Sequence, residues 1–194
     1  MQQTLQNLAK AFVGESQARN RYNMYASTAR KEGYLQIAEI FEKTAEQERE
    51  HAGWFFKMIQ QLEEKTGTKV GEMIVETGVP IMRGTTLENL GYAVAGELHE
   101  FESMYPEFAR IAMEEGLNEI SSRITSIARA EQHHAERYLK LKEQLEKETI
   151  FAKAEETTWI CDKCGYEHNG KNPPAKCPSC GHEHNYFQVK CENY

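Results

Sequence analysis

The sequence predicts a mainly α-helical fold: a four-helix bundle with a long crossover, followed by a small C-terminal metal-knuckle domain. Three observations predict it. Four segments carry apolar residues at alternating steps of three and four, which is the period of one helix face. A glycine-containing stretch over 66–85 divides these segments into two pairs. Two Cys-x-x-Cys pairs after residue 160 mark a chemically different unit.

Each helical stripe contains a glutamate where an apolar side chain is expected. The stripes run over 8–26, 37–62, 87–111 and 120–145. Short connections at Glu32-Gly33 and Glu115-Gly116 join the helices within each pair, and such connections make antiparallel neighbours. The change of composition along the chain places a helical domain at 1–148, a linker at 149–157 and a knuckle domain at 158–194.

Composition excludes several classes of protein. The net charge of -7 over 194 residues argues against a nucleic-acid partner, because phosphate binding needs a basic surface. No apolar stretch approaches the roughly 20 residues that span a bilayer. The first ten residues are polar and lack the apolar core of a signal peptide. Four of the five cysteines stand at metal-ligand spacing, which favours a reducing cytoplasm over a disulfide scaffold.

Two Glu-x-x-His motifs lie in the second and fourth stripes, and single glutamates lie in the first and third. A spacing of three residues puts carboxylate and imidazole on one helix face. Buried carboxylates without partners cost several kcal/mol each, so divalent cations are expected among them. This set is the known pattern of ferritin-like di-iron and di-manganese proteins, and its donors suit iron, manganese or zinc. The six residues are Glu15, Glu48, His51, Glu97, Glu131 and His134.

A lone Glu-x-x-His on a helix is common and usually binds nothing, but six residues in this order on four helices favour a metal site. Three neighbours have two interpretations each. Glu100, one turn after Glu97, is either a further ligand or a solvated flank residue. Tyr22 is either plain core or a hydrogen-bond donor to a ligand carboxylate. Tyr105, one place past the apolar stripe, is a weaker case of the same kind.

The cysteine pairs predict tetrahedral thiolate coordination. Cys161/Cys164 and Cys177/Cys180 are separated by twelve residues, and a glycine that permits a tight turn follows each pair. Four thiolates accept zinc or a single iron, and spacing alone does not choose between them. Cys191 has no partner, and we assign it no role.

In these motifs the chain resembles the rubrerythrins over nearly its whole length. The runs that carry the resemblance are 11–22 (AFVGESQARNRY), 45–51 (AEQEREH), 96–100 (GELHE) and 104–110 (MYPEFAR). It implies a ferritin-like di-iron domain followed by a rubredoxin-like domain. The implied di-iron ligands are Glu15, Glu48, His51, Glu97, Glu100, Glu131 and His134. The implied ligands of a mononuclear iron are Cys161, Cys164, Cys177 and Cys180.

The resemblance also implies a function, which is the reduction of hydrogen peroxide to water in the cytoplasm. Electrons would come from rubredoxin or an NAD(P)H-linked reductase and pass through the cysteine-bound iron to the two irons. The residues expected to act in catalysis are Glu100 and His51, which would exchange at one iron, and Tyr22, which would orient a ligand. A homodimer is implied, with helical hairpins exchanged between subunits in some members. Zinc can replace iron in either site on purification.

Two rival functions remain at this stage. A ferritin-like ferroxidase or iron-handling protein would share the carboxylate site, but it needs neither Glu100 nor the cysteine tail. A non-enzymatic zinc-ribbon interaction protein would share the cysteine motif. Assembly size distinguishes the first rival, since storage requires a large shell. Metal content distinguishes the second, since zinc among the thiolates removes the electron path.

Overall fold

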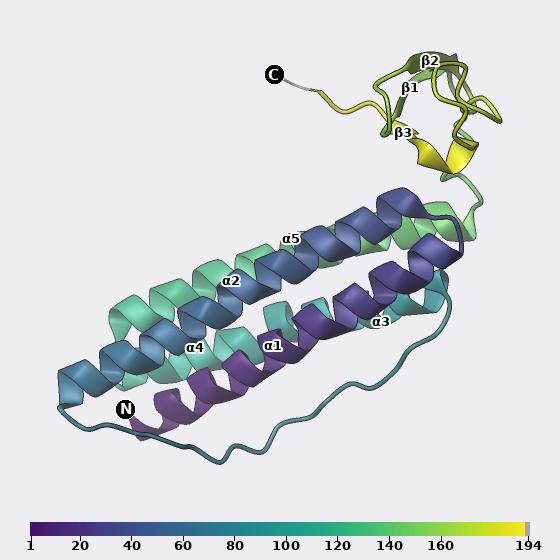
Figure 1. The fold of residues 1–194 in the computed structure, drawn as a ribbon. Helices are drawn as coiled ribbons and strands as arrows, with labels where there is room; N and C mark the ends of the chain where they lie inside the picture. The colour runs from purple at the N-terminus through teal and green to yellow at the C-terminus, as the bar shows by residue number, and fades with distance from the viewer. Residues whose placement is uncertain (193–194) are drawn as a thin grey trace.

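The computed structural model describes residues 1–192 and shows a long helical bundle with a small β domain at one end (Figure 1). The predicted mainly α-helical class is confirmed. The last two positions of the expected knuckle domain, Asn193 and Tyr194, lie outside the described residues. The helical elements are α1 (Gln2–Lys31), α2 (Leu35–Thr66), α3 (Thr86–His99), the π-helix η1 (Glu100–Met104), α4 (Tyr105–Glu114) and α5 (Asn118–Glu146).

Two helical hairpins form the bundle, as the short Glu-Gly connections predict. Helix α1 packs on α2, and α5 packs on both α3 and α4. Gly33 and Gly116 follow the helix ends with φ of 87° and 76°, a left-handed conformation that other residues avoid. In the first turn, the amide of Tyr34 donates to the carbonyl of Ala29 at 2.8 Å, which closes the end of α1.

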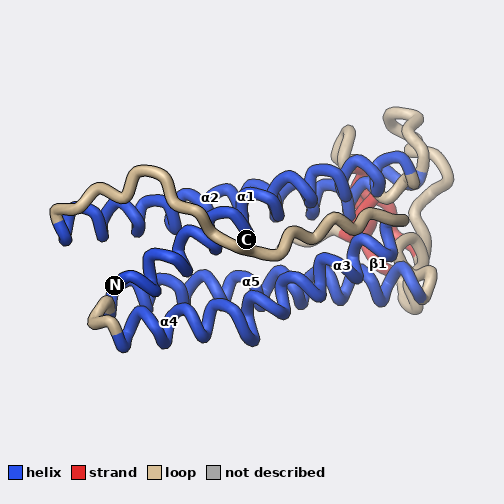
Figure 2. The backbone as a smooth tube through the Cα atoms, turned by 90° about the horizontal axis from the view of Figure 1, so that it is seen from below, coloured by secondary structure: helices blue, strands red, loops and turns tan. Residues whose placement is uncertain are grey.

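The crossover from α2 to α3 returns along the length of the bundle (Figure 2). It has to, because α2 is 32 residues long, about 48 Å at the helical rise, and α3 begins back at its starting end. The phenol of Tyr25 donates to the carbonyl of Met82 at 2.8 Å near the end of the crossover. A capping box formed by Thr85 and Glu88 then starts α3. The apolar patch near Ile74 runs along the bundle as irregular chain, and the Ile74 side chain is 89% exposed.

The third helix differs from the expected continuous α-helix. Between α3 and α4 the chain forms the π-helix η1, in which the amide of Tyr105 donates to the carbonyl of Glu100, five residues back. Pro106 stands at the start of α4. Proline lacks an amide hydrogen, and its ring clashes with the carbonyl four residues back in a regular helix. A π turn accommodates both effects by taking in one additional residue.

This additional residue moves the buried face of α4 forward by one position. The positions that continue the apolar stripe of this segment are only partly buried. The residue that follows each of them in the sequence is buried in its place. The partly buried positions are Met104, Phe108 and Ile111. The buried ones are Tyr105, Ala109 and Ala112. The π turn therefore points Tyr105, and not Met104, into the bundle.

The C-terminal unit is an antiparallel sheet of three strands in the order β2-β1-β3. Trp159 and Phe187 form its core with Cys161 and Cys177, and Tyr166 and Tyr186 pack against them. The elements are β1 (Thr157–Cys161), β2 (Glu167–Gly170), the 3-10 turn η2 (His184–Tyr186) and β3 (Phe187–Val189).

The sheet domain packs on the end of the bundle where α1 turns into α2. The ring of Phe151, in the connection after α5, stacks on Tyr34 at 6.5 Å and meets His184 edge-on at 4.9 Å. Among the described helices, none combines the length and apolar character that a bilayer crossing requires.

Candidate metal centres

Six of the seven expected ligands of the dinuclear site meet inside the bundle, all except Glu100. Helix α1 contributes Glu15, α2 contributes Glu48 and His51, α3 contributes Glu97, and α5 contributes the last two, Glu131 and His134. Five of the six side chains are buried. The imidazole of His51 is the exception at 13% exposed, so this ligand faces the solvent side of the site.

The ligands form two groups that share two carboxylates. Ligand atoms of Glu15, Glu48, His51 and Glu131 lie within 4.8 Å of one another. The same holds for the second group, which consists of Glu48, Glu97, Glu131 and His134. Because Glu48 and Glu131 belong to both groups, the residues would suit two adjacent metal ions that share these two carboxylates.

The donor atoms of the dinuclear site approach one another closely, and only part of these contacts have hydrogen-bond geometry, as between the Nδ1 atom of His51 and an oxygen of Glu48 at 3.0 Å. The Nδ1 atom of His134 lies 2.9 Å from an oxygen of Glu131 and 3.2 Å from one of Glu48. Even so, it has no partner of hydrogen-bond geometry among the described residues, and neither does either oxygen of Glu131. Buried polar atoms rarely stay unpaired. Lone pairs that converge in this way fit a shared cation, so the residues present suit a pair of metal ions.

Two tyrosines hold the outer carboxylates in place. The buried phenol of Tyr22 donates to Glu97, and that of Tyr105 donates to Glu15. Such hydrogen bonds fix the orientation of a ligand carboxylate, so that its free oxygen points toward the metal position. The sequence indicated this role for Tyr22, and less strongly for Tyr105, because Tyr105 lies one place past the apolar stripe. The missed signal is Pro106, which predicts the π turn that brings Tyr105 inward.

The charges of the metal-free cluster are strongly coupled. Burial raises the pKa of Glu15 well above its usual value, and the nearby carboxylates add to this effect. Burial and the charge of Glu48 raise the pKa of Glu97 to about 8. Burial opposes charge on Glu48 too, but the adjacent imidazoles of His134 and His51 outweigh it and lower its pKa to about 2. Without metal, the two imidazoles supply the positive charge that the carboxylates need.

Glu100 stands beside this cluster and outside both ligand groups. It is the first residue of the π-helix and is partly exposed. Burial, followed by the charges of Glu97, Glu131 and Glu48, raises the pKa of Glu100 well above its usual value. The other off-stripe neighbours, His99, His133, Glu46 and Glu102, are exposed, as expected of surface residues.

The four cysteines form a second centre in the sheet domain. The Sγ atoms of Cys161 and Cys180 lie 3.7 Å apart, and those of Cys164 and Cys177 lie 3.6 Å apart. These separations are too long for disulfides but close to the edge of a tetrahedron with metal–sulfur bonds of about 2.3 Å. Cys191 is exposed and stands outside the group.

The two cysteine knuckles have equivalent backbone turns. The amides of Gly165 and Gly181 donate to the carbonyls of Cys161 and Cys177, each at 2.8 Å. Both glycines have positive φ, 73° and 75°, as the turn requires. The four thiols are thereby held facing one point, which fits a single tetrahedral ion.

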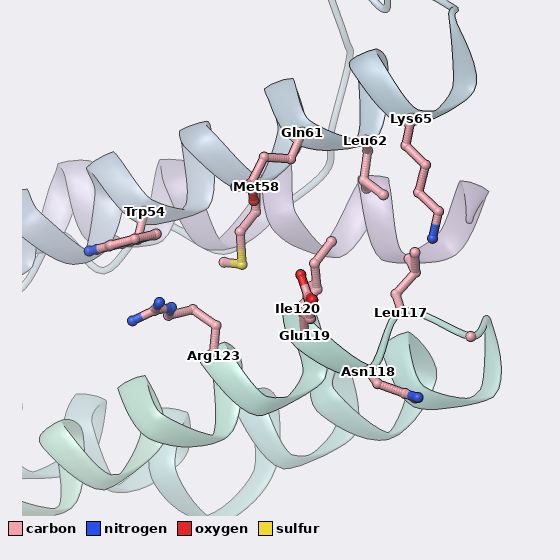
Figure 3. A pocket seen from close by; sticks show the side chains of 11 residues that line it. Trp54, Met58, Gln61, Leu62, Lys65, Leu117, Asn118, Glu119, Ile120 and Arg123 are labelled. Carbon is pink, nitrogen blue, oxygen red and sulfur yellow. The ribbon is translucent and has the colours of Figure 1, made fainter.

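A cavity of about 530 Å³ lies away from both centres, between the C-terminal half of α2 and the start of α5 (Figure 3). Its wall includes Trp54, Met58 and Arg123 but none of the predicted ligands. The guanidinium of Arg123 lies over the Trp54 ring, 3.9 Å from its centroid. The cavity is therefore not the metal chamber, whose space is filled by the ligand side chains themselves.

Comparison with known proteins agrees with this geometry. The rubrerythrin family model matches residues 6–142, and the model for the rubredoxin-like domain of rubrerythrin matches residues 159–188. The chain belongs to the rubrerythrin family. A protein of Methanocaldococcus jannaschii that carries the rubrerythrin name is 51% identical over 195 residues, covering 100% of this chain and 96% of its own length. Rubrerythrin of Nitratidesulfovibrio vulgaris is 41% identical, covering 96% and 93% respectively.

The fold of this rubrerythrin-family chain is also found among solved structures. Nigerythrin in its fully reduced, all-ferrous state aligns with a TM-score of 0.64 and 33% identity, covering 96% of this chain and 86% of that one. Nigerythrin in a mixed-valence state aligns with a TM-score of 0.62. Together with the two ligand sets, these findings identify a di-iron carboxylate site and a rubredoxin-like four-cysteine iron site.

We predict that Tyr105→Phe lowers the free energy of unfolding of the iron-loaded chain by about 1.5–3 kcal/mol, the range for a hydrogen bond to a charged group. The reason is that Glu15 loses its buried donor. Denaturant titration measures the change. Tyr138→Phe is the matched control, because this buried hydroxyl has no hydrogen-bond partner among the described residues. Equal losses in both variants would contradict the proposed bond to Glu15.

We also predict that loading the dinuclear site at pH 7 releases more than one proton per chain. Burial lowers the pKa values of His51 and His134, but carboxylate partners outweigh it and raise them to about 10 and about 12. Both imidazoles therefore hold protons at pH 7 in the metal-free chain, and metal binding must displace them. Zinc calorimetry in buffers of different ionisation enthalpy, with the cysteine site already loaded, counts the protons. The affinity of the dinuclear site for zinc should fall as the pH falls, because protons compete with the metal for the same ligands. Zinc binding without proton release would refute the prediction.

Proposed function

We propose that this chain reduces hydrogen peroxide to water at its di-iron site, using electrons relayed from the four-cysteine iron. The single observation that carries the proposal is the combination, in one chain, of two metal positions sharing Glu48 and Glu131 with a separate tetrahedral thiolate centre. A dinuclear site suits a two-electron reaction, and the thiolate centre suits one-electron delivery. When bound, the two irons supply the two electrons that peroxide takes up.

The chain's own residues would hold and orient this centre. Glu48 and Glu131 belong to both groups and would bridge, whereas Glu15 and Glu97 would each serve one position. Tyr22 and Tyr105 fix these two outer carboxylates through hydrogen bonds. His51 is the ligand that reaches solvent, so we place the entry of peroxide and protons on its side.

His51 and Glu100 are proposed to alternate at the first metal position. A neutral imidazole suits the less charged diferrous state, and a carboxylate suits the more charged diferric state. Two observations support this assignment: the partial exposure of His51, and the charge of the ligand carboxylates acting on Glu100. Glu100 also begins a π-helix, an irregular turn often found at functional sites.

A dimer would shorten the electron path. The sheet domain packs near the start of α2, where the carboxyl of Asp162, next to Cys161, interacts with Glu39. Nine residues separate Glu39 from Glu48, so the di-iron site lies roughly 14 Å further along the helix. We therefore infer that the cysteine domain of a second copy serves this di-iron site, in a homodimer. Four cysteines arranged as metal ligands favour a reducing cytoplasmic location.

We predict that Cys161→Ser abolishes peroxide turnover driven by NAD(P)H through rubredoxin and its reductase. The variant loses a ligand of the thiolate centre, while the carboxylate site stays intact and a prereduced sample still consumes one equivalent of peroxide. Cys191→Ser, outside the ligand group, is the control and keeps wild-type turnover. Coupled peroxide assays with metal analysis test this. Turnover at the wild-type rate in Cys161→Ser would end the relay proposal, and zinc as the native occupant would do the same.

We predict that Glu100→Ala retains iron, because six ligands remain, but loses selectivity for peroxide over dioxygen. Glu102→Ala, an exposed neighbour, is the control, and its stability stays within about 0.5 kcal/mol, as for most surface changes. Structures of oxidised and reduced wild-type protein provide the decisive measurement. Glu100 pointing to solvent in both states, with the first iron unmoved, would leave six ligands and remove the exchange.

A further inference from the structure

The two tyrosines that hold ligand carboxylates have different neighbours. The ring of Tyr105 lies 5.4 Å from Phe55 and 6.2 Å from Phe108, measured between centroids. A phenylalanine ring is far harder to oxidise than a phenol, and it has no hydroxyl proton to release. A one-electron oxidation that reached Tyr105 would therefore stay there, confined by an apolar shell.

Tyr22 has other tyrosines beside it. Its ring lies 6.1 Å from that of Tyr25 and 5.5 Å from that of Tyr138. Phenols at these separations can exchange an electron, provided that each has an acceptor for its proton. Tyr22 has one in Glu97, to which its hydroxyl already donates. An oxidation that reached Tyr22 could therefore move on, away from the metals.

The two tyrosines beside Tyr22 differ in the surroundings of their hydroxyl groups. The hydroxyl of Tyr25 donates at 2.8 Å to the carbonyl of Met82, a crossover residue that is 47% exposed. The hydroxyl of Tyr138 is buried and has no partner within the described part of the chain. Of this pair, only Tyr25 has its hydroxyl hydrogen-bonded to a segment exposed to solvent, where water can take its proton.

We propose that Tyr22 and Tyr25 form an escape route for oxidising equivalents, from the di-iron site to the crossover at Met82. The route rests on the proposed function, because its oxidant is hydrogen peroxide that arrives when the electron supply is exhausted. Without it, a trapped oxidant would attack the ligands and core of the bundle. Tyr25 would thus protect the enzyme from excess peroxide and take no part in its normal turnover.

The chemistry balances with peroxide as oxidant. One hydrogen peroxide and two tyrosine phenols give two waters and two tyrosyl radicals. Tyr22 loses an electron to the site while its proton shifts to Glu97. Tyr25 then passes an electron to the Tyr22 radical, Tyr22 regains its proton from Glu97, and the Tyr25 proton leaves to solvent beyond Met82. Tyr22 next gives the second electron, with its proton again on Glu97, and solvent supplies the two protons that peroxide takes up. A one-electron donor such as a thiol or ascorbate restores Tyr25, with a proton from water.

The test uses the iron-loaded full chain with excess peroxide and no reductant. Rapid-freeze electron paramagnetic resonance, with ring-deuterated tyrosine as a label, identifies tyrosyl radicals, and a spin trap followed by peptide mass mapping locates them. The variants are Tyr25→Phe and its matched control Tyr138→Phe, each of which removes one hydroxyl next to Tyr22. Circular dichroism and iron content establish that both are folded and loaded.

We expect a radical in the wild type that sharpens on deuteration, with the trap adduct on Tyr25. Tyr25→Phe should lose most of this adduct, whereas Tyr138→Phe should keep it. Under repeated peroxide pulses, Tyr25→Phe should lose activity after several-fold fewer turnovers, although its initial rate with an electron donor equals that of the wild type.

Three outcomes would overturn the route. The adduct could persist unchanged on other residues in Tyr25→Phe, it could fall equally in Tyr138→Phe, or peroxide could be consumed with no tyrosyl radical. In each of these cases the peroxidase function stands and only the route fails. A prereduced protein that does not consume peroxide at all would overturn both proposals, and peroxide consumption recorded in the same samples separates the two failures.

Discussion

The burial of four carboxylates beside two imidazoles is the interaction on which the rest of the bundle depends. Each glutamate occupies a core position within a helix, where an apolar side chain would otherwise pack. An unpaired carboxylate there costs several kcal/mol, and a domain of this size has only about 5–15 kcal/mol of net stability. The helices are therefore held in register by the need to bring all six donors to the same two positions. A shift of one residue in any helix would remove its ligand from the site.

The π-helix solves a problem of register within the third helix. Glu97 and Tyr105 must both face the site, yet they are eight residues apart, and eight residues of α-helix turn through about 800°, or about 80° away from the starting face. The turn of η1 absorbs one residue, so Tyr105 behaves as if it followed Glu97 by seven, about 20° from the same face. The irregular turn thus lets one helix supply a metal ligand and a hydrogen-bond donor to the opposite carboxylate.

The two sides of the di-iron site differ in how they connect to the protein surface. On one side the partly exposed His51 is the ligand nearest to solvent. On the other, Tyr22 continues through Tyr25 to the crossover segment, which lies along the outside of the bundle (Figure 2). The crossover therefore does more than link two hairpins of opposite direction, because its carbonyl at Met82 is the partner of a core phenol.

The sequence by itself determined the helical class and the pairing of helices, and it located the residues that converge in the two candidate metal centres. These follow from spacing, because a glutamate in an apolar stripe and a Cys-x-x-Cys pair each identify their chemistry locally. Its family resemblance was also confirmed by comparison over most of the chain. The position of Tyr105 could not be read from the stripe, since a period of 3.6 assumes an unbroken α-helix and Pro106 breaks it. Only the tertiary structure decided that Tyr138 lies beside Tyr22 and that His51 is the ligand that reaches solvent, because these contacts join helices far apart in the chain, and no local pattern encodes the distance between them.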